Sequence, residues 1–339
     1  MNRTRNNTIT RRDFLSRTTA LGAASMLGWP EIARAEPPPE TRKIRLVRIP
    51  AICIAPEYLA EELLRLEGFT EVEYVEMDRS GAEEMLIANR ADFASTAPPS
   101  VLPALDIGKA VVTLAGIHGG CYELFAHNPI SSIRELKNKR VAISVFGSVD
   151  YYFIASMVAY VGMDPRKDIN WIEAKTFDRT MQYFIDGRAD AFLGSPPQPQ
   201  MLRRQKIGNV IVNTVQDKPW SQYFCCVVAA HPEFVANNPI ATKRALRAIL
   251  KAADLCVSEP ERVAKFIVAK GYERNYDIAL EVVRSLFFDR WRTYSIEDSL
   301  RFYALRLHEV GMIKTSPNTL VARGTDLRFL NELKKELKA

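Results

Sequence analysis

Short apolar segments alternate with amphipathic helical patterns along most of this 339-residue chain. The stretch Lys43–Ile49 alternates polar and apolar side chains, which is the period of a strand with one buried face. A helix is expected from Ala55-Pro56, because proline fits a first helical turn and leucines at 59, 63, 64 and 66 follow at helical spacing. Further strands are expected at 72–77, 92–95, 141–145, 169–173 and 190–193. Further helices are expected over 148–161, over 178–185 and after Ser80, which we expect to cap its helix. This order indicates an α/β fold with parallel sheets.

One stretch of the pattern repeats at the level of single residues. Residues 90–99 read RADFASTAPP, and residues 188–197 read RADAFLGSPP. Both copies place Arg-Ala-Asp at the end of a predicted helix and Pro-Pro just past the next predicted strand. Either two helix-to-strand junctions share their chemistry by coincidence, or the chain contains two lobes of similar build.

Two strand-like segments, Tyr122–His127 and Tyr223–Ala230, are expected to carry the chain between these lobes. They bracket one α/β unit of ordinary domain size. The prediction is therefore a first lobe made of residues 43–126 and 226–339 and a second lobe made of residues 127–225. Helical periodicity after the return predicts C-terminal helices at 239–257, 260–269, 276–288, 296–310 and 327–338.

The first 35 residues contain three features of an export signal in the required order. Arg11-Arg12 precedes an uncharged run over 18–30, and Ala33-Arg34-Ala35 offers small residues to a signal peptidase. The run is shorter than the roughly 20 apolar residues that a membrane anchor needs. The pattern resembles a twin-arginine (Tat) signal, whose pathway exports folded proteins, and the alternative is a disordered basic leader before a cytosolic domain. We expect cleavage near Ala35, a tether over 36–42 and a soluble periplasmic protein without a lipid anchor.

Charge gives little further information once this leader is set aside. The chain has 46 Lys and Arg against 40 Asp and Glu, a formal net charge of +6. Six of the basic residues and two of the acidic ones lie in residues 1–35, so the remainder has 40 basic and 38 acidic side chains, a net charge of +2. Nothing in this balance calls for a nucleic-acid or anionic-membrane partner.

The order of the segments resembles that of the periplasmic substrate-binding proteins of nitrate, sulfonate, taurine and pyrimidine-precursor ABC importers. Residues 133–143 (IRELKNKRVAI) are similar to the stretch that leads into that family's second lobe, and residues 162–169 (GMDPRKDI) to a turn that follows. Residues 232–239 (PEFVANNP) are similar to its return helix. The resemblance covers nearly all of residues 43–270. One departure is the segment 49–53 (IPAIC), where relatives usually have a polar glycine-rich turn.

The resemblance implies an α/β protein with the two-lobed periplasmic-binding-protein fold, type II-like, in which two parallel-sheet lobes are joined by two crossover strands. It implies a monomer without enzymatic activity or cofactor that captures a small organic ligand of the sulfonate, nitrate or pyrimidine class. Its partners would be the permease and ATPase of an ABC importer, and the Tat translocase during export. Two alternatives stay open: an exported ligand-sensing subunit for a membrane kinase, and an enzyme of the pyrimidine-synthase type on the same fold.

Ligands of two-lobed α/β proteins bind where strands end and helices begin. The segments 50–53, 78–81, 95–98 and 146–150 would line the cleft here, with Ser195 on the second wall. Hydroxyl groups at these places either contact a ligand or cap the helices, and a glycine lets backbone approach the ligand. Asp150 would repel a sulfonate or nitrate, which favours a neutral or cationic ligand. The expected ligand-binding residues are Cys53, Ser80, Thr96, Ala97, Gly147, Ser148, Asp150, Asp178, Ser195 and Trp220.

Five scattered cysteines do not form an evident disulfide framework, and the sequence does not show whether any of them pair. Cys225-Cys226 resembles part of the multi-cysteine loop of a fungal pyrimidine-synthesising enzyme with this fold, although that motif has more cysteines. Adjacent strand residues face opposite sides, so we expect this pair to pack in the core and not to bind iron. His118 and Cys121 have no evident partners in a chain with four histidines. We therefore expect no metal site.

Overall fold

The computed structural model describes residues 36–49, 51–78 and 80–338. The predicted export signal and its cleavage site lie outside the described residues. From Pro39 onward the chain forms one compact unit, which contains two five-stranded sheets flanked by helices. The predicted α/β class is thereby confirmed. In the part of the chain that the structure describes, every helix is too short or too polar to cross a membrane.

The first sheet has the strand order β2-β1-β3-β10-β4. Strands β2, β1 and β3 run parallel, whereas β10 runs antiparallel to both β3 and β4. The alternation predicted for the first strand is visible in the full burial of Ile44 and Leu46. The elements are β1 Lys43–Arg48, η1 Ile52–Ile54, α2 Ala55–Leu66, β2 Glu71–Glu76, α3 Ala82–Ile87, β3 Phe93–Thr96, α4 Pro98–Asp106, β4 Val112–Gly119 and β10 Phe224–Ala230.

The second sheet has the order β7-β6-β8-β5-β9 and repeats this plan. Strands β7, β6 and β8 are parallel, and β5 is antiparallel to both β8 and β9. Each sheet therefore contains one strand that runs against the others. The elements are β5 Glu123–Ala126, η2 Ile133–Leu136, β6 Arg140–Ile143, α5 Val149–Tyr160, β7 Asn170–Glu173, α6 Phe177–Ile185, β8 Ala191–Gly194, α7 Gln198–Gln205 and β9 Asn209–Asn213.

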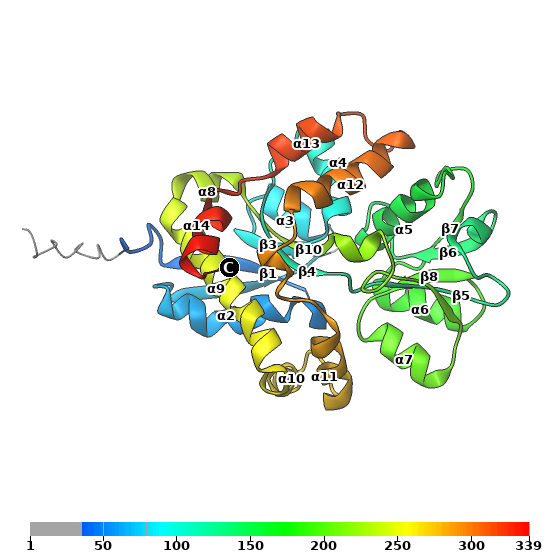
Figure 1. Ribbon diagram of the computed structural model, residues 1–339, viewed down its shortest axis with the longest axis horizontal. Helices are drawn as coiled ribbons and strands as arrows, with labels where there is room; N and C mark the ends of the chain where they lie inside the picture. The colour runs from blue at the N-terminus through cyan, green and yellow to red at the C-terminus, as the bar shows by residue number, and fades with distance from the viewer. Residues whose placement is uncertain (1–35, 50, 79, 339) are drawn as a thin grey trace, which may run out of the picture. The chain divides into compact units, whose positions relative to one another are not determined.

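The chain after β10 is helical, as its periodicity predicted. Helix α9 packs along α2 beside the first sheet (Figure 1), and α12 packs against both α4 and α5. The elements are η3 Trp220–Gln222, which precedes β10, and then α8 Pro232–Asn237, α9 Pro239–Ser258, α10 Pro260–Ala269, α11 Tyr276–Ser285, η4 Arg290–Arg292, α12 Ile296–Glu309, α13 Pro317–Gly324 and α14 Arg328–Glu336.

Two segments carry the chain between the sheets, and both run between carboxyl edges, the edges where the parallel strands end. Residues 120–122 connect the end of β4 to the start of β5, and the other segment connects β9 to β10. The hydroxyl oxygen of Thr214 in the second segment accepts hydrogen bonds from the backbone N–H groups of Cys121 and Tyr122, at 3.1 and 2.9 Å. A Cβ atom on Gly120 would lie 2.2 Å from the carbonyl oxygen of Thr214. Only glycine allows the two segments to touch here.

The repeated Arg-Ala-Asp stretch has the same structural role in both sheets. The Asp92 carboxylate accepts a 2.8 Å hydrogen bond from the backbone N–H of Arg45 and forms an ion pair with its guanidinium, which joins β1 to the start of β3. In the second sheet, Asp190 accepts the same 2.8 Å bond from Arg140 and pairs with its guanidinium. The sequence repeat therefore marks two equivalent βαβ units.

Four sequence-based expectations are wrong in detail. Glu123–Ala126 was assigned to the first lobe, but it forms β5 and pairs with β8, because a strand's pattern does not tell which sheet it joins. Similarly, β10 begins at Phe224, so the return to the first sheet precedes residue 226. Ser80 does not cap its helix, since Gly81 occupies that position. Leu66 does not belong to the buried face of α2, because it is 83% exposed at the helix end.

Candidate functional site

We place the candidate site at the carboxyl edge of the first sheet, where the chain crosses to the second. Strands β1 and β4 end at this edge. Strand β10 begins there, because it runs antiparallel to β4. Residues that are far apart in the sequence, from η1, from the end of β4 and from the start of β10, therefore meet at one place. Edges of this kind are where α/β proteins bind ligands.

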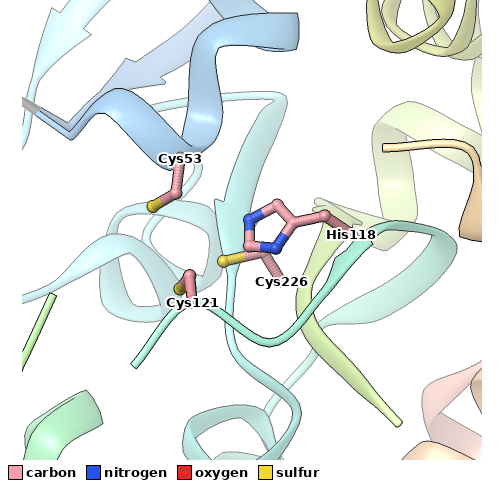
Figure 2. Close-up of side chains that lie close together, drawn as sticks. All are labelled: Cys53, His118, Cys121 and Cys226. Atoms are coloured by element: carbon pink, nitrogen blue, oxygen red, sulfur yellow. The ribbon is translucent and has the colours of Figure 1, made fainter. Parts of the chain in front are cut away.

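Four side chains with metal-binding atoms converge at this edge (Figure 2). They are Cys53 of η1, His118 of β4, Cys121 of the first crossing segment and Cys226 of β10. One ligand atom from each lies within 4.8 Å of the others, and all four residues are at most 5% exposed. The Sγ atom of Cys121 also lies 3.0 Å from that of Cys225, and both are free thiols. We call the four residues the Cys–His cluster.

The imidazole of His118 is held in one orientation. Its Nδ1 atom lies 3.2 Å from the carbonyl oxygen of Gly119, and since a carbonyl only accepts, Nδ1 carries the proton and donates. Phe288 packs against the ring with its edge, at a centroid distance of 5.5 Å. Among the described residues, Nε2 of His118 has no hydrogen-bond partner. This buried nitrogen can therefore bind either a proton or a metal ion.

Without a bound ion, the Cys–His cluster favours a protonated His118 imidazole beside a deprotonated Cys226 thiolate. Burial opposes protonation of His118, but the neighbouring Cys226 thiolate raises the pKa of the imidazole to about 10. The hydrogen bond from the Cys121 thiol lowers the pKa of Cys226, whereas burial raises the pKa of Cys121. An imidazolium beside a thiolate is the resulting state, and a bound cation would replace the proton.

Glu57 is a buried acid close to this edge that the sequence did not suggest. It lies in the first turn of α2, is 1% exposed, and accepts hydrogen bonds from the backbone N–H and the hydroxyl of Ser95 at the end of β3. Its other oxygen, Oε1, has no partner among the described residues. Burial raises the pKa of Glu57 to about 8, despite the opposing hydrogen bonds from Ser95.

The predicted wall on the first sheet is largely hydrogen-bonded within itself. Thr96 and Ser100 both donate their hydroxyl protons to the carboxylate of Glu83. Ala97 is buried and is the N-cap residue of α4. Ser80 is exposed and donates to the Asp78 carboxylate, which also pairs with an arginine. Glu83 therefore holds the hydroxyl of Thr96 and Asp78 holds that of Ser80, the two hydroxyl groups of this wall that were expected to meet a ligand.

The predicted wall on the second sheet is the turn between β6 and α5. Gly147 has φ +86°, and Ser148 is the N-cap residue of α5 and donates to the carbonyl of Val145 at 2.6 Å. Asp150 is buried, and both its oxygens accept hydrogen bonds from nearby serines. Phe146, which was not predicted as a site residue, is 56% exposed beside the ring of Tyr151. This wall therefore presents an aromatic ring to solvent.

Three further predicted residues lie elsewhere or contribute less. Trp220 is 3% exposed and packs edge-on against Tyr160 and Phe302, so it belongs to the core. Asp178 is exposed in the first turn of α6, and Ser195 is half-buried at the end of β8. In the described part of the chain, no hydrogen bond joins the predicted residues of one wall to those of the other.

One described surface depression lies away from this edge. It encloses about 440 Å³ at the amino edge of the first sheet, and its lining includes Lys109, Pro232 and Arg323. It contains none of the predicted site residues and no part of the Cys–His cluster. We keep the site at the carboxyl edge, because His118 and Glu57, two of the buried residues with a partnerless polar atom, lie there together with the thiols of the Cys–His cluster.

A family model supplies the decisive comparison. The model of NMT1/THI5-like proteins matches residues 58–263, which is more than half of the chain. The chain belongs to the NMT1/THI5-like family. The matched range of this NMT1/THI5-like chain begins in α2 and ends in α10, so it includes the second sheet, the crossing segments and all of the first sheet except β1. No functionally curated protein sequence matches the chain.

Solved structures confirm the fold of this NMT1/THI5-like protein. The periplasmic nitrate-binding protein of Synechocystis PCC 6803 superposes with a TM-score of 0.74 at 17% identity, covering 89% of this chain and 90% of the other. An alkanesulfonate-binding protein of Xanthomonas axonopodis pv. citri has a TM-score of 0.69 at 14% identity, covering 86% and 99%. A Candida albicans protein described as having the generic periplasmic binding protein fold has 0.67 at 13%, covering 84% and 96%. The predicted family resemblance and two-lobed fold are thus confirmed.

Sequence reasoning about the NMT1/THI5-like chain named Cys53, which lies in η1 after the first strand, but missed its neighbours. The expectation that His118 and Cys121 have no partners is wrong, because Cys53 and Cys226 reach them from distant segments. No spacing in the sequence signals this convergence. The only available signal was positional, since each of the four residues lies at the carboxyl end of a strand or at the start of the returning one.

Proposed function

We propose that the protein is the solute-binding component of an ABC importer, which captures a small organic molecule in the periplasm and delivers it to a permease and ATPase. It would be exported by the Tat translocase, act as a soluble monomer and catalyse no reaction. The observation that carries this proposal is the joining of two sheets at their carboxyl edges by two short segments. This arrangement places the loops after both sets of parallel strands on one side, where a solute can contact both.

The charged groups near these loops favour one of the three expected ligand classes. Glu83 and Asp150 are carboxyl groups at the predicted walls, and Phe146 exposes an aromatic ring on the turn that leads into the helix of Asp150. Carboxylates repel nitrate and sulfonate, whereas an exposed ring stacks on a planar ligand. We therefore propose a planar neutral or cationic solute of the pyrimidine class. The nitrate and alkanesulfonate ligands of the structural relatives are not carried over to this chain.

Thermal denaturation of the purified protein with a panel of compounds tests the proposal. The panel contains pyrimidines, aromatic acids, alkanesulfonates and nitrate. A ligand present at 100 times its Kd stabilises the folded state by about 2.7 kcal/mol, which gives a clear rise in Tm. Stabilisation by pyrimidines but not by nitrate or sulfonates is expected. Stabilisation by the anions alone would overturn the ligand class, and a flat response across all four classes would count against solute binding.

The aromatic wall has a matched test. Phe146→Ala should lower the affinity for the stabilising compound about tenfold, equal to about 1.4 kcal/mol, because the stacking surface is lost. Leu66→Ala is the control, since Leu66 is an exposed apolar side chain on α2, remote from this turn. Isothermal titration measures both. Equal affinities for the two variants would show that the solute does not contact this wall.

A further inference from the structure

We propose that Cys53, His118, Cys121 and Cys226 form a binding site for one borderline-soft metal ion, of which Zn²⁺ is the type. The site would be independent of the solute proposed above, because its four ligand residues are buried and only Cys53 comes from a segment that was expected to line the cleft. This departs from the sequence-based expectation that the chain has no metal site. Three thiolates and one imidazole are a common ligand set of tetrahedral zinc.

The geometry of the Cys–His cluster fits such an ion with small movements. Zinc bonds of about 2.3 Å to sulfur and 2.0–2.1 Å to nitrogen place the ligand atoms roughly 3.5–3.8 Å apart in a tetrahedron. The four atoms already lie within 4.8 Å of one another, so side-chain adjustments of about 1 Å suffice. Figure 2 shows the three sulfur atoms and the imidazole gathered around one place. Harder ions such as Mg²⁺ prefer oxygen ligands and are excluded by this set.

The surroundings of His118 support the same assignment. Metal-binding histidines usually donate their other ring proton to a carbonyl or carboxylate, which fixes the tautomer. In this protein Nδ1 donates to Gly119, and the buried Nε2 has no partner in the described residues. A buried nitrogen without a partner costs free energy unless something binds it. An ion bonded to Nε2 removes that cost.

The direct test uses the full chain, purified under reducing conditions and freed of metal. Titration with Zn²⁺ against a chromogenic chelator should show one tightly bound ion per chain. Titration with Co²⁺ should produce the intense visible bands of tetrahedral cobalt together with a near-ultraviolet thiolate-to-cobalt charge-transfer band. These spectra report ligand type and geometry in the unmodified protein. Absence of stoichiometric binding, or a weak octahedral cobalt spectrum, would overturn the proposal.

Substitutions then test which atoms bind. Cys53→Ser and Cys226→Ser should each weaken Zn²⁺ binding by about 100-fold or more, since even groups that only orient a ligand contribute 10–100-fold. Cys256→Ser is the matched control, because Cys256 is a buried thiol on α9 outside the Cys–His cluster. It should leave both the affinity and the cobalt spectrum unchanged. Circular dichroism confirms that each variant is folded.

Cys225→Ser separates this site from an alternative one. Cys225 is adjacent to Cys226 and its thiol lies near that of Cys121, but it is not one of the four ligands. We expect this variant to keep the wild-type affinity for Zn²⁺. Loss of binding in Cys225→Ser with normal binding in Cys53→Ser would overturn the assigned ligand set. If Cys226→Ser does not fold, the Cys53→Ser titration and the wild-type cobalt spectrum still decide the matter.

Discussion

Each sheet has a buried acid in the first turn of the helix that follows an equivalent strand. The two acids differ in how many of their oxygens accept hydrogen bonds. Glu57 lies in the first turn of α2 after β1, and Asp150 lies in the first turn of α5 after β6. Each accepts hydrogen bonds from a serine that follows or ends a strand, Ser95 in one sheet and Ser144 in the other. Asp150 has partners on both oxygens, whereas Oε1 of Glu57 has none in the described chain.

This difference indicates that the buried acids at equivalent positions in the two sheets have different roles. In the second sheet the acid completes a closed network that fixes the turn before α5. In the first sheet the acid leaves an oxygen without a partner beside the edge where the Cys–His cluster lies. Buried polar groups without a hydrogen-bond partner can mark functional positions, and here Glu57 lies near three buried thiols and a buried imidazole. The first sheet therefore contributes more of the buried chemistry, and the second sheet more of the exposed wall.

The largest expected effect is the pH dependence that Glu57 contributes. Its pKa is about 8 in the folded protein against 4.5 ordinarily, so the folded state binds the proton more tightly. The contribution of Glu57 to stability is then greatest below pH 4.5 and falls as the pH rises to about 8, by up to about 5 kcal/mol in this window. Glu57→Gln removes the loss and keeps an oxygen for Ser95. Urea denaturation should show that the free energy of unfolding of the variant, relative to that of the wild type, is higher at pH 8 than at pH 5. An equal difference at both pH values would contradict the comparison.

The next effect concerns the repeated Arg-Ala-Asp stretch. Asp92→Ala should reduce the free energy of unfolding by about 3 kcal/mol, because it leaves the backbone N–H and guanidinium of Arg45 without their buried partner. Asp190→Ala removes the same contacts in the second sheet, but there the pair is more exposed to water, so a smaller loss is expected. Urea denaturation at pH 7 measures both. Equal losses would show that burial does not distinguish the two copies.

The smallest effect tests the closed network of the second sheet. Asp150→Asn places an amide where donors surround the carboxylate, and should cost about 1–2 kcal/mol. Asp178→Asn is the control, because Asp178 is an exposed acid in the first turn of the neighbouring helix α6. The control should change stability by less than about 0.5 kcal/mol. An unchanged free energy of unfolding in Asp150→Asn would show that the hydrogen bonds to both Asp150 oxygens add no stability. That result would contradict the contrast with Glu57.

Much of the fold follows from local pattern. The alternation over 43–49 and the helical spacing after Ala55 predicted β1 and α2, and the two RAD stretches predicted two equivalent units. These features depend on neighbouring residues, which a sequence displays directly. The assignment of β5 failed because its pairing with β8 joins residues far apart in the chain.

The candidate site was less predictable for the same reason. Cys53 and Cys226 come from opposite halves of the chain, and only the antiparallel insertion of β10 brings them together. Glu57 reads in the sequence as an ordinary first-turn acid, and nothing local shows that it is buried. Trp220 was assigned to the cleft on its type alone, whereas aromatic side chains more often fill cores, as it does here.

The close contact at Gly120 has a mechanical consequence. Because Thr214 binds the backbone of Cys121 and Tyr122 there, the spacing of the two crossing segments is fixed at this level. Any rotation of one sheet against the other must then pivot near this point, and atoms near a pivot move less than atoms far from it. The Cys–His cluster includes Cys121 and so lies beside the pivot, whereas Phe146 lies on a distal turn. Sheet movement can therefore open and close the walls while an ion near the pivot keeps its coordination.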